Sequence, residues 1–464
     1  GLFGVVGTST GSGSVDITTH RGSTIEATGP LGVGIAATVT NGTATVETRG
    51  DITDGLTGIV ASALGSGNVD VTVHRQSDIT TDLTGVAASS LGSGTISVSV
   101  AGDITTTAAL GTGISATSLG GTGNINVDTW RSSEINTAGD GISALITNAG
   151  SAGTTAIVAR GDIETTGANS AGIRATSNGT GEVRVSTTRS ADITGAGNGV
   201  VATGLKISLY NDGDISTGQT EYLVRAGAGN AELWNDYNGD INTGGLTSKL
   251  VIDNTGGTGS LTIYNSGQIY GTLALNDANN AFHNSSFESW HTSGLNTFGS
   301  GDNLLENTGA IVAGEDGDTT FDFGGGVDVF TNTGLFFSQG LTTTPGLETF
   351  IATGGGIVMQ YPNSLANDVV DMSSADYNNT GTAWLYVDAE VGPAGSVSDT
   401  LKIGSISGGG VTYVGVNDLY TGPGIYNPTG IGVVDVLNPG SANAGDFVLA
   451  GGPISKGLWN YDMF

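Results

Sequence analysis

Acidic side chains recur through the first half of the chain, each directly before an isoleucine, and they are the groups that could give this protein hydrolytic chemistry. Glycosidases use two carboxylates, about 5–10 Å apart, on either side of one cleft. The recurring acids are Asp51, Asp78, Asp103, Glu134, Asp162, Asp192, Asp214 and Asp240. Because they come once per repeat and not in pairs, we interpret them as a ladder of turn residues along one edge, offset by nearby arginines.

The other residues with catalytic potential form no recognised motif. His20, His74, His283 and His291 lack a metal-binding spacing such as H-E-x-x-H, and the chain has no cysteine. No G-D-S-G or G-x-S-x-G motif marks a nucleophilic serine. The acidic run 314–318 lacks a complete calcium-loop pattern, so an ordinary acidic turn is the better interpretation. We therefore predict that the protein is not an enzyme and has no catalytic residue, cofactor or bound metal.

The tripeptide Arg-Gly-Asp, which integrins read, occurs at residues 49–51 and again at 160–162. Both copies fall inside a structural repeat in which Gly-Asp is already required. Coincidence is therefore the better account of both.

Five ring-bearing residues each lie five positions before a repeat isoleucine, so we expect them to share one edge of the repeat. They are His20, His74, Trp130, Tyr210 and Tyr264. Exposed rings in a row can stack on the faces of sugars, which makes this ridge a candidate ligand site. The alternative is a packing ridge that fills the turn.

These residues are positioned by a repeat of the form Gly/Ser-Asp-Ile-x-Thr. Its isoleucines are residues 25, 52, 79, 104, 135, 163, 193, 215, 241 and 269, so the spacing is 22–31 residues. Each repeat also holds a Gly-Ile/Val-x-Ala strand, as at 113–116, and an alternating strand, as at 69–73. Three strands per repeat predict an all-β fold, a right-handed, three-sided parallel β-helix. A β-sandwich has no reason to repeat one tripeptide once per three strands.

Alternation of side chains along the strands predicts which residues are buried. We expect a stack inside one corner of the β-helix that contains Ile52, Ile79, Ile104, Ile163, Ile193, Ile215 and Ile241. Three aligned copies of an aromatic-Asn pair predict that Asn211, Asn235 and Asn265 form a side-chain ladder at one turn.

The repeat suggests two regions. Residues 1–340 are predicted to form the β-helix, with a loop inserted between coils near 276–302, where the period breaks. Residues 341–464 have longer apolar strands, such as 383–387 and 432–436, and are predicted to cap the open end of the β-helix.

Composition limits the partners of the chain. Its 464 residues include 81 glycines and carry a net charge of −30. A polyanion repels nucleic acid and anionic lipid, so we expect neither as a partner. No apolar stretch of about 18 residues predicts a transmembrane helix, and the first residues, 1–4, do not open a signal peptide, so we expect a mature or truncated segment.

The C-terminal region resembles the end of pertactin-like bacterial autotransporter passengers. The resemblance rests most specifically on residues 398–404, 430–436, 447–449 and 457–462, and more loosely on 320–330. In that family this region caps the β-helix and assists its folding, and a membrane β-barrel, absent from this chain, follows it.

The resemblance implies an extracellular rod on the bacterial surface, secreted by the type V route. Its function would be adhesive or structural and non-catalytic, with a glycan or protein of a host or neighbouring cell, or its own copies, as the partner. Two alternatives stay open: a self-assembling surface layer or filament component, and a glycan-active β-helix enzyme.

Overall fold

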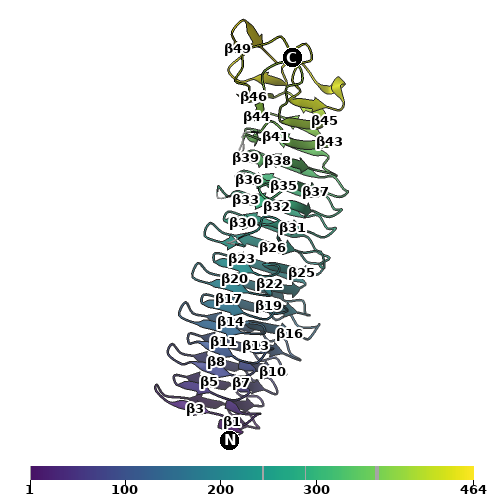
Figure 1. Ribbon diagram of the computed structural model, residues 1–464. Coiled ribbons are helices and arrows are strands. Elements are labelled where there is room, and N and C mark those ends of the chain that lie inside the picture. The colour runs from purple at the N-terminus through teal and green to yellow at the C-terminus, as the bar shows by residue number, and fades with distance from the viewer. Residues whose placement is uncertain (1, 243–244, 288, 361–364, 464) are drawn as a thin grey trace. The chain divides into compact units, whose positions relative to one another are not determined.

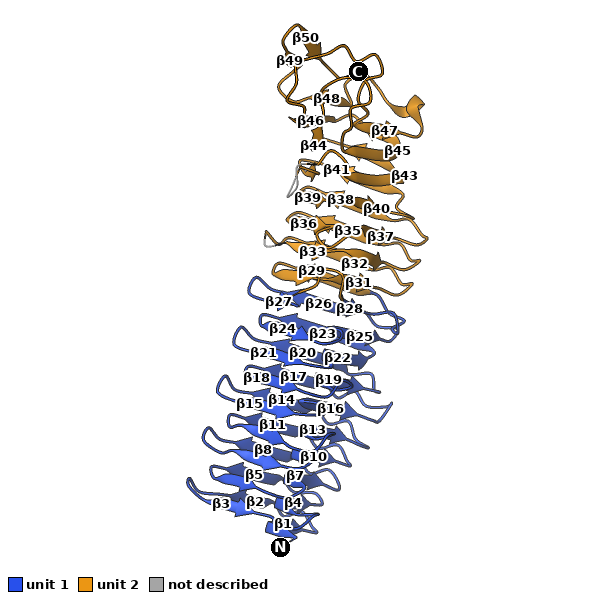
Figure 2. Ribbon diagram, in the orientation of Figure 1, with its two compact units in different colours: residues 1–243, 251–260 blue, residues 244–250, 261–464 orange. Residues whose placement is uncertain are grey.

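The computed structural model describes residues 2–242, 245–287, 289–360 and 365–463 of the chain. The described residues are all β apart from one short 3-10 turn, η1 (Pro439–Ser441) (Figure 1). They divide into two compact units, one of residues 1–243 and 251–260 and the other of residues 244–250 and 261–464 (Figure 2). Each unit is a parallel β-helix, so the predicted fold class is confirmed.

Unit 1 is built from coils of three strands, and each strand pairs in parallel with the equivalent strand of the next coil. The first sheet contains β1 (Phe3–Ser9), β4 (Val33–Val39), β7 (Thr57–Ala63), β10 (Thr84–Ser90), β13 (Thr112–Ser118), β16 (Ile142–Ile146), β19 (Ala171–Ser177), β22 (Asn198–Gly204), β25 (Tyr222–Ala226) and β28 (Leu250–Asp253). The second contains β2 (Val15–Thr18), β5 (Ala44–Thr48), β8 (Val69–Val73), β11 (Ile96–Val100), β14 (Ile125–Thr129), β17 (Thr155–Ala159), β20 (Glu182–Thr187), β23 (Lys206–Asn211) and β26 (Ala231–Asn235). The third contains β3 (Thr24–Glu26), β6 (Asp51–Thr53), β9 (Ile79–Thr81), β12 (Ile104–Thr106), β15 (Glu134–Thr137), β18 (Asp162–Thr165), β21 (Asp192–Gly195), β24 (Asp214–Thr217) and β27 (Asp240–Ile241).

The repeat isoleucines form one continuous stack inside the third sheet. Each is the direct partner of the next along parallel strands, from Ile25 and Ile52 through to Ile215 and Ile241. From Ile52 onward they are at most 1% exposed. The predicted isoleucine corner is therefore confirmed.

The glycine of the Gly-Ile/Val-x-Ala strand explains why the two repeat motifs occur together. In seven coils, a Cβ atom on this first-sheet glycine would lie 2.3–2.6 Å from Cγ2 of the repeat isoleucine in the same coil. The glycines are Gly34, Gly58, Gly85, Gly113, Gly141, Gly172 and Gly199. The missing side chain leaves the space that the isoleucine fills, so the narrow interior is packed without voids.

Replacing Gly113 with alanine should therefore destabilise unit 1. The new Cβ would lie 2.5 Å from Cγ2 of Ile135 and 2.6 Å from the carbonyl oxygen of Gly141, and neither can retreat without moving a coil. Overpacking of this kind costs about 1–3 kcal/mol. Gly150→Ala is the matched control, because its Cβ would meet only the Asn148 side chain, at 3.5 Å. Equal urea midpoints for the two variants would contradict this explanation of the motif.

Unit 2 continues the three-strand pattern and then changes it. Its first sheet begins with β31 (Thr272–Ala274), β34 (Gly294–Thr297), β37 (Thr319–Asp322) and β40 (Leu341–Thr343), and its second with β29 (Leu261–Asn265), β32 (Ala281–Asn284), β35 (Leu304–Asn307), β38 (Val329–Asn332) and β41 (Thr349–Ala352). Its third sheet contains β30 (Gln268–Tyr270), β33 (Trp290–Thr292), β36 (Ala310–Ala313), β39 (Leu335–Ser338), β42 (Gly356–Val358), β44 (Thr382–Ala389), β46 (Val411–Asp418) and β48 (Phe447–Leu449). The long strand β43 (Val369–Asn379) pairs with both β40 and β41, and β45 (Thr400–Gly408) pairs with β43 along both halves.

The loop predicted near 276–302 is wrong, because this stretch contributes β32, β33 and β34 to the parallel ladders of unit 2. Its asparagines suggested a loop. However, Asn284 is buried on the inner side of β32, and Phe282 and Trp290 fill the core. The coils here are shorter than the earlier repeats, which is why the period seemed to break.

The parallel pairing of strands does not change at residue 340, where the boundary between two regions was predicted. Parallel pairing runs on through β43, β44, β45 and β46 to β47 (Val434–Val436) and β48. The predicted strand 383–387 lies within β44, and only residues 434–436 of the predicted strand 432–436 form a strand. In β43, two sides of the coil merge into one strand, and its pairing with β45 has a register shift between Met372 and Asp376. The last strands, β49 (Ile454–Lys456) and β50 (Trp459–Tyr461), pair antiparallel at the C-terminal end of unit 2 (Figure 2).

Asparagine ladders line the turn after the second sheet in both units. In unit 1, Asn211 Nδ2 donates to Asn235 Oδ1 at 2.8 Å, as predicted. In unit 2, Asn265 begins a ladder in which each amide nitrogen donates to the next amide oxygen at 2.7–2.8 Å, through Asn284, Asn307 and Asn332. These side chains are at most 2% exposed, so the ladders satisfy buried polar atoms that would otherwise cost free energy.

Candidate functional site

The repeat acids lie on the outer side of the third sheet of unit 1, where the carboxylates of three of them bond to backbone amides of the following coil. Asp51 Oδ1 accepts a hydrogen bond from the Asp78 amide (3.1 Å), Asp103 Oδ1 from the Glu134 amide (2.9 Å), and Asp162 Oδ1 from the Asp192 amide (3.1 Å). Register pairing places Glu134 beside Asp162, and Asp192 beside Asp214. Asp51, Asp103 and Asp162 thus each join two neighbouring coils through a side-chain bond.

Crowding of these carboxylates disfavours their charged forms. Burial raises the pKa of Asp192, and the charges of Asp162 and Asp214 raise it further. Burial likewise raises the pKa of Asp103, although the hydrogen bond from the Glu134 amide works in the opposite direction. Such shifts can mark a functional site, but here burial is their largest cause, and the charges of acids in neighbouring coils add to it. Among the described residues, no group of three or more His, Cys, Asp or Glu side chains is arranged to hold a metal ion.

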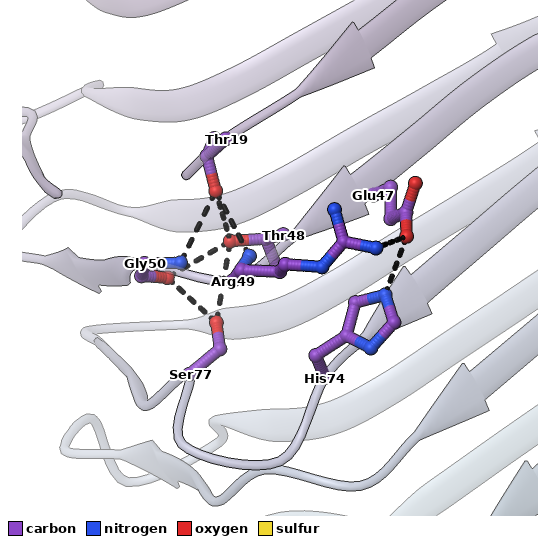
Figure 3. A network of polar contacts seen from close by, with 7 residues as sticks. All are labelled: Thr19, Glu47, Thr48, Arg49, Gly50, His74 and Ser77. Carbon is purple, nitrogen blue, oxygen red and sulfur yellow. Dashed lines mark hydrogen bonds and ion pairs between the residues drawn. The ribbon is translucent and has the colours of Figure 1, made fainter. Parts of the chain in front are cut away.

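Around Arg49, a network of hydroxyl groups and charged side chains links neighbouring coils of unit 1 at a turn (Figure 3). Thr19 Oγ1 accepts hydrogen bonds from the amides of Arg49 (3.0 Å) and Gly50 (3.2 Å) and lies 3.0 Å from Thr48 Oγ1. The Arg49 guanidinium pairs with Glu47, which also bonds to His74 Nε2 at 2.6 Å. Gly50 is buried and Arg49 is engaged, so this Arg-Gly-Asp copy is not presented as a free loop.

The structure does not bring the five predicted ring residues together as one row. His20, His74 and Trp130 follow second-sheet strands of unit 1, in alternate coils, whereas Tyr210 lies within β23 as the partner of Ser186 and Trp234. Across the second sheet, Tyr210 pairs with Ser186, Ser186 pairs with Val158, and Val158 pairs with Asp128. Tyr210 therefore occupies the position of Asp128, which is two residues before Trp130. The turn before the isoleucine is shorter in later coils, so counting back five residues reaches the strand instead of the turn.

The predicted rings also serve local contacts. Trp130 is exposed, and its Nε1 donates to Ser99 Oγ at 3.1 Å. Within unit 2, Tyr264 stacks on His283 with a centroid separation of 5.0 Å, and His283 Nδ1 lies 2.7 Å from Glu306 Oε2. These contacts place the rings in separate polar clusters.

Another group of rings, which the sequence did not single out, lies on the outer face of the third sheet of unit 2. Trp384 and Tyr386 on β44 form a stacked pair with centroids 5.7 Å apart and planes 7° apart. Tyr413 on β46 is the register partner of Trp384, and their centroids are 5.2 Å apart. Trp384 and Tyr386 are partly exposed and Tyr413 is exposed. We name these three residues the aromatic platform.

No helix in the described part of the chain is long and apolar enough to span a membrane. No protein-family model matches the chain, and no curated protein is significantly similar to it. The chain is a parallel β-solenoid, a fold that is compatible with an autotransporter passenger.

Proposed function

We propose that this protein is a non-catalytic rod of the autotransporter-passenger kind, exported to the bacterial cell surface, where it binds a glycan or protein of another cell. The single observation that carries the proposal is the use of the repeat acids. The carboxylates of Asp51, Asp103 and Asp162 each hold an amide of the next coil, so these three acids serve to build the scaffold. Repetition of one scaffold unit produces long outer faces, which suit adhesion better than a single cleft.

The charge of the chain fits this proposal. A net charge of −30 keeps a surface rich in β-strands soluble and disfavours anionic partners. The outward residues of the third sheet of unit 1 are mostly acids and threonines. They form a solvated face that disfavours association with other copies of the chain.

The competing function is that of a glycan-active β-helix enzyme, and it is tested by turnover. The full chain is incubated with a panel of polysaccharides, and new reducing ends are measured over a day. We expect no release above a heat-denatured control. Release that is lost in Asp162→Asn or Asp192→Asn would overturn the non-catalytic assignment, because these acids would then act on substrate.

A further inference from the structure

The aromatic platform of unit 2 has no equivalent in the outer side of the third sheet of unit 1. In unit 1 the positions directly before the buried isoleucines carry Asp and Glu, and those directly after them mostly Thr and other small polar residues. In unit 2 the corresponding positions on β44 carry Trp384 and Tyr386 around the buried Leu385. Large rings on an outward face contribute nothing to the core, so their presence requires another explanation.

Two glycines lie beside the rings, and one of them, Gly415, provides the space in which the Tyr386 ring lies. Gly356 and Gly415 are the register partners of Trp384 and Tyr386 on the neighbouring strands. A Cβ atom on Gly415 would lie 2.8 Å from the Tyr386 ring, so this ring extends across the backbone of β46. The Tyr386 ring thus covers bare backbone, and its orientation is fixed before any ligand arrives.

The platform carries no charge, although the chain has 43 acidic residues. The outward positions of β44 and β46 are Thr382, Trp384 and Tyr386, and Val411, Tyr413, Gly415 and Asn417. The nearby carboxylate of Asp388, the register partner of Asn417, is fully buried. An uncharged face of this kind favours a neutral ligand and offers nothing to a basic or acidic one.

Two amide side chains beside the rings have fixed orientations. Asn417 Nδ2 donates to Asp388 Oδ1 at 2.6 Å, and Gln360 Nε2 donates to the carbonyl oxygens of Val387 (2.7 Å) and Gly415 (3.1 Å). Because both nitrogens are engaged, each side chain presents its carbonyl oxygen as an acceptor. A ligand that meets the platform therefore encounters apolar ring faces flanked by acceptors for hydroxyl groups.

We propose that the aromatic platform binds a neutral carbohydrate, with pyranose rings stacked on Trp384, Tyr386 and Tyr413. A pyranose has an apolar face of C–H groups and a rim of hydroxyls, which complements ring faces flanked by acceptors. Spacings of 5.2 and 5.7 Å between neighbouring rings are close to the length of one sugar residue. The inference rests on the proposed function, for which it names the ligand class and the binding residues.

The test measures binding of the full chain to an immobilised panel of neutral and acidic glycans. We expect retention on at least one neutral glycan. Trp384→Ala and Tyr413→Ala should each weaken this binding by about tenfold or more. Tyr237→Ala is the matched control, because it removes an exposed aromatic side chain from unit 1 and should leave binding unchanged. Tyr413 is exposed, so Tyr413→Ala still tests the inference if Trp384→Ala is unstable. For both variants, a circular dichroism spectrum and a thermal midpoint equal to those of wild type show that the fold is intact.

Three results would overturn the inference: wild-type chain that binds no neutral glycan, platform variants that bind as tightly as wild type, or variants that lose self-association on gel filtration while glycan binding persists. The last result would identify a second copy of the chain as the occupant.

Attachment to cells of beads coated with each variant separates this inference from the proposed function. If platform variants attach as well as wild type, the inference fails and the adhesive function stands.

Discussion

Unit 2 should lose stability as the pH rises from 4 to 7, and Asp368→Asn should recover part of that loss. The cause is a cluster of three carboxylates, Asp368, Asp388 and Asp399, each at most 1% exposed. Asp399 accepts the amides of Asp368 (2.9 Å) and Asp388 (2.7 Å) on its two oxygens. Within the described part of the chain, Oδ2 of Asp368 and Oδ2 of Asp388 have no hydrogen-bond partner.

Burial raises the pKa of Asp399 to about 7; its two amide hydrogen bonds oppose this, and the charges of Asp368 and Asp388 add to it. Burial also raises the pKa of Asp368. In the unfolded chain an aspartate titrates near 4. The folded state therefore keeps protons that the unfolded state releases, so its stability is fully present below pH 4 and is lost as the pH approaches 7. A shift of about three units corresponds to a loss on the order of 4 kcal/mol.

The measurement is the free energy of unfolding of the full chain in urea at pH 4.5 and pH 8. Asp368→Asn keeps an oxygen for the Gly340 amide, which bonds to Oδ1 at 2.8 Å, and removes one charge from the cluster. We expect it to be more stable than wild type at pH 8 by about 1–3 kcal/mol and nearly equal at pH 4.5. Asp435→Asn, an exposed change in the same unit, is the control for net charge. If both variants shift the pH profile equally, the buried cluster is not responsible.

Trp290→Ala should cause the largest loss of stability among single changes in unit 2, about 3–5 kcal/mol. Trp290 is fully buried, and its ring packs against Phe282 (centroids 4.6 Å apart) and Phe321 (5.5 Å). Its Nε1 donates to the carbonyl oxygen of Gly271 at 2.9 Å. Alanine would leave both a large cavity and an unsatisfied buried carbonyl.

Trp290→Phe separates these two effects, because it keeps most of the packing and loses only the hydrogen bond. We expect it to cost about 1–2 kcal/mol. Trp459→Ala, at a position that is 42% exposed near the C-terminus of the same unit, should cost less than 1 kcal/mol. A Trp290→Ala protein that unfolds at the same urea concentration as Trp459→Ala would show that residues 276–302 do not contribute to the core.

The isoleucine corner and the parallel ladders could be predicted from sequence because each position repeats with the same chemistry. Ile52 and Ile163 occupy identical surroundings, so a short motif was enough to place both. Asn211 and Asn235 were predictable for the same reason, since they lie at equivalent positions beside aromatic residues.

The alignment of the rings could not be predicted in this way. Register across coils depends on turn length, and one or two residues fewer in a turn move Tyr210 from the edge that holds Trp130 into the strand. The core of residues 276–302 was missed because Phe282 and Trp290 replace the small apolar residues of the earlier coils. The aromatic platform depends on pairing between Trp384 and Tyr413, 29 positions apart, in coils where the motif has disappeared.

The central claim, a non-catalytic adhesive rod, is tested most directly by attachment of beads coated with the full chain to epithelial and bacterial cells. Bound beads are counted with and without an excess of soluble chain. The account predicts attachment well above that of beads coated with albumin, and its loss when soluble chain competes. Attachment no greater than that of the albumin beads to every cell type, with or without competitor, would contradict it.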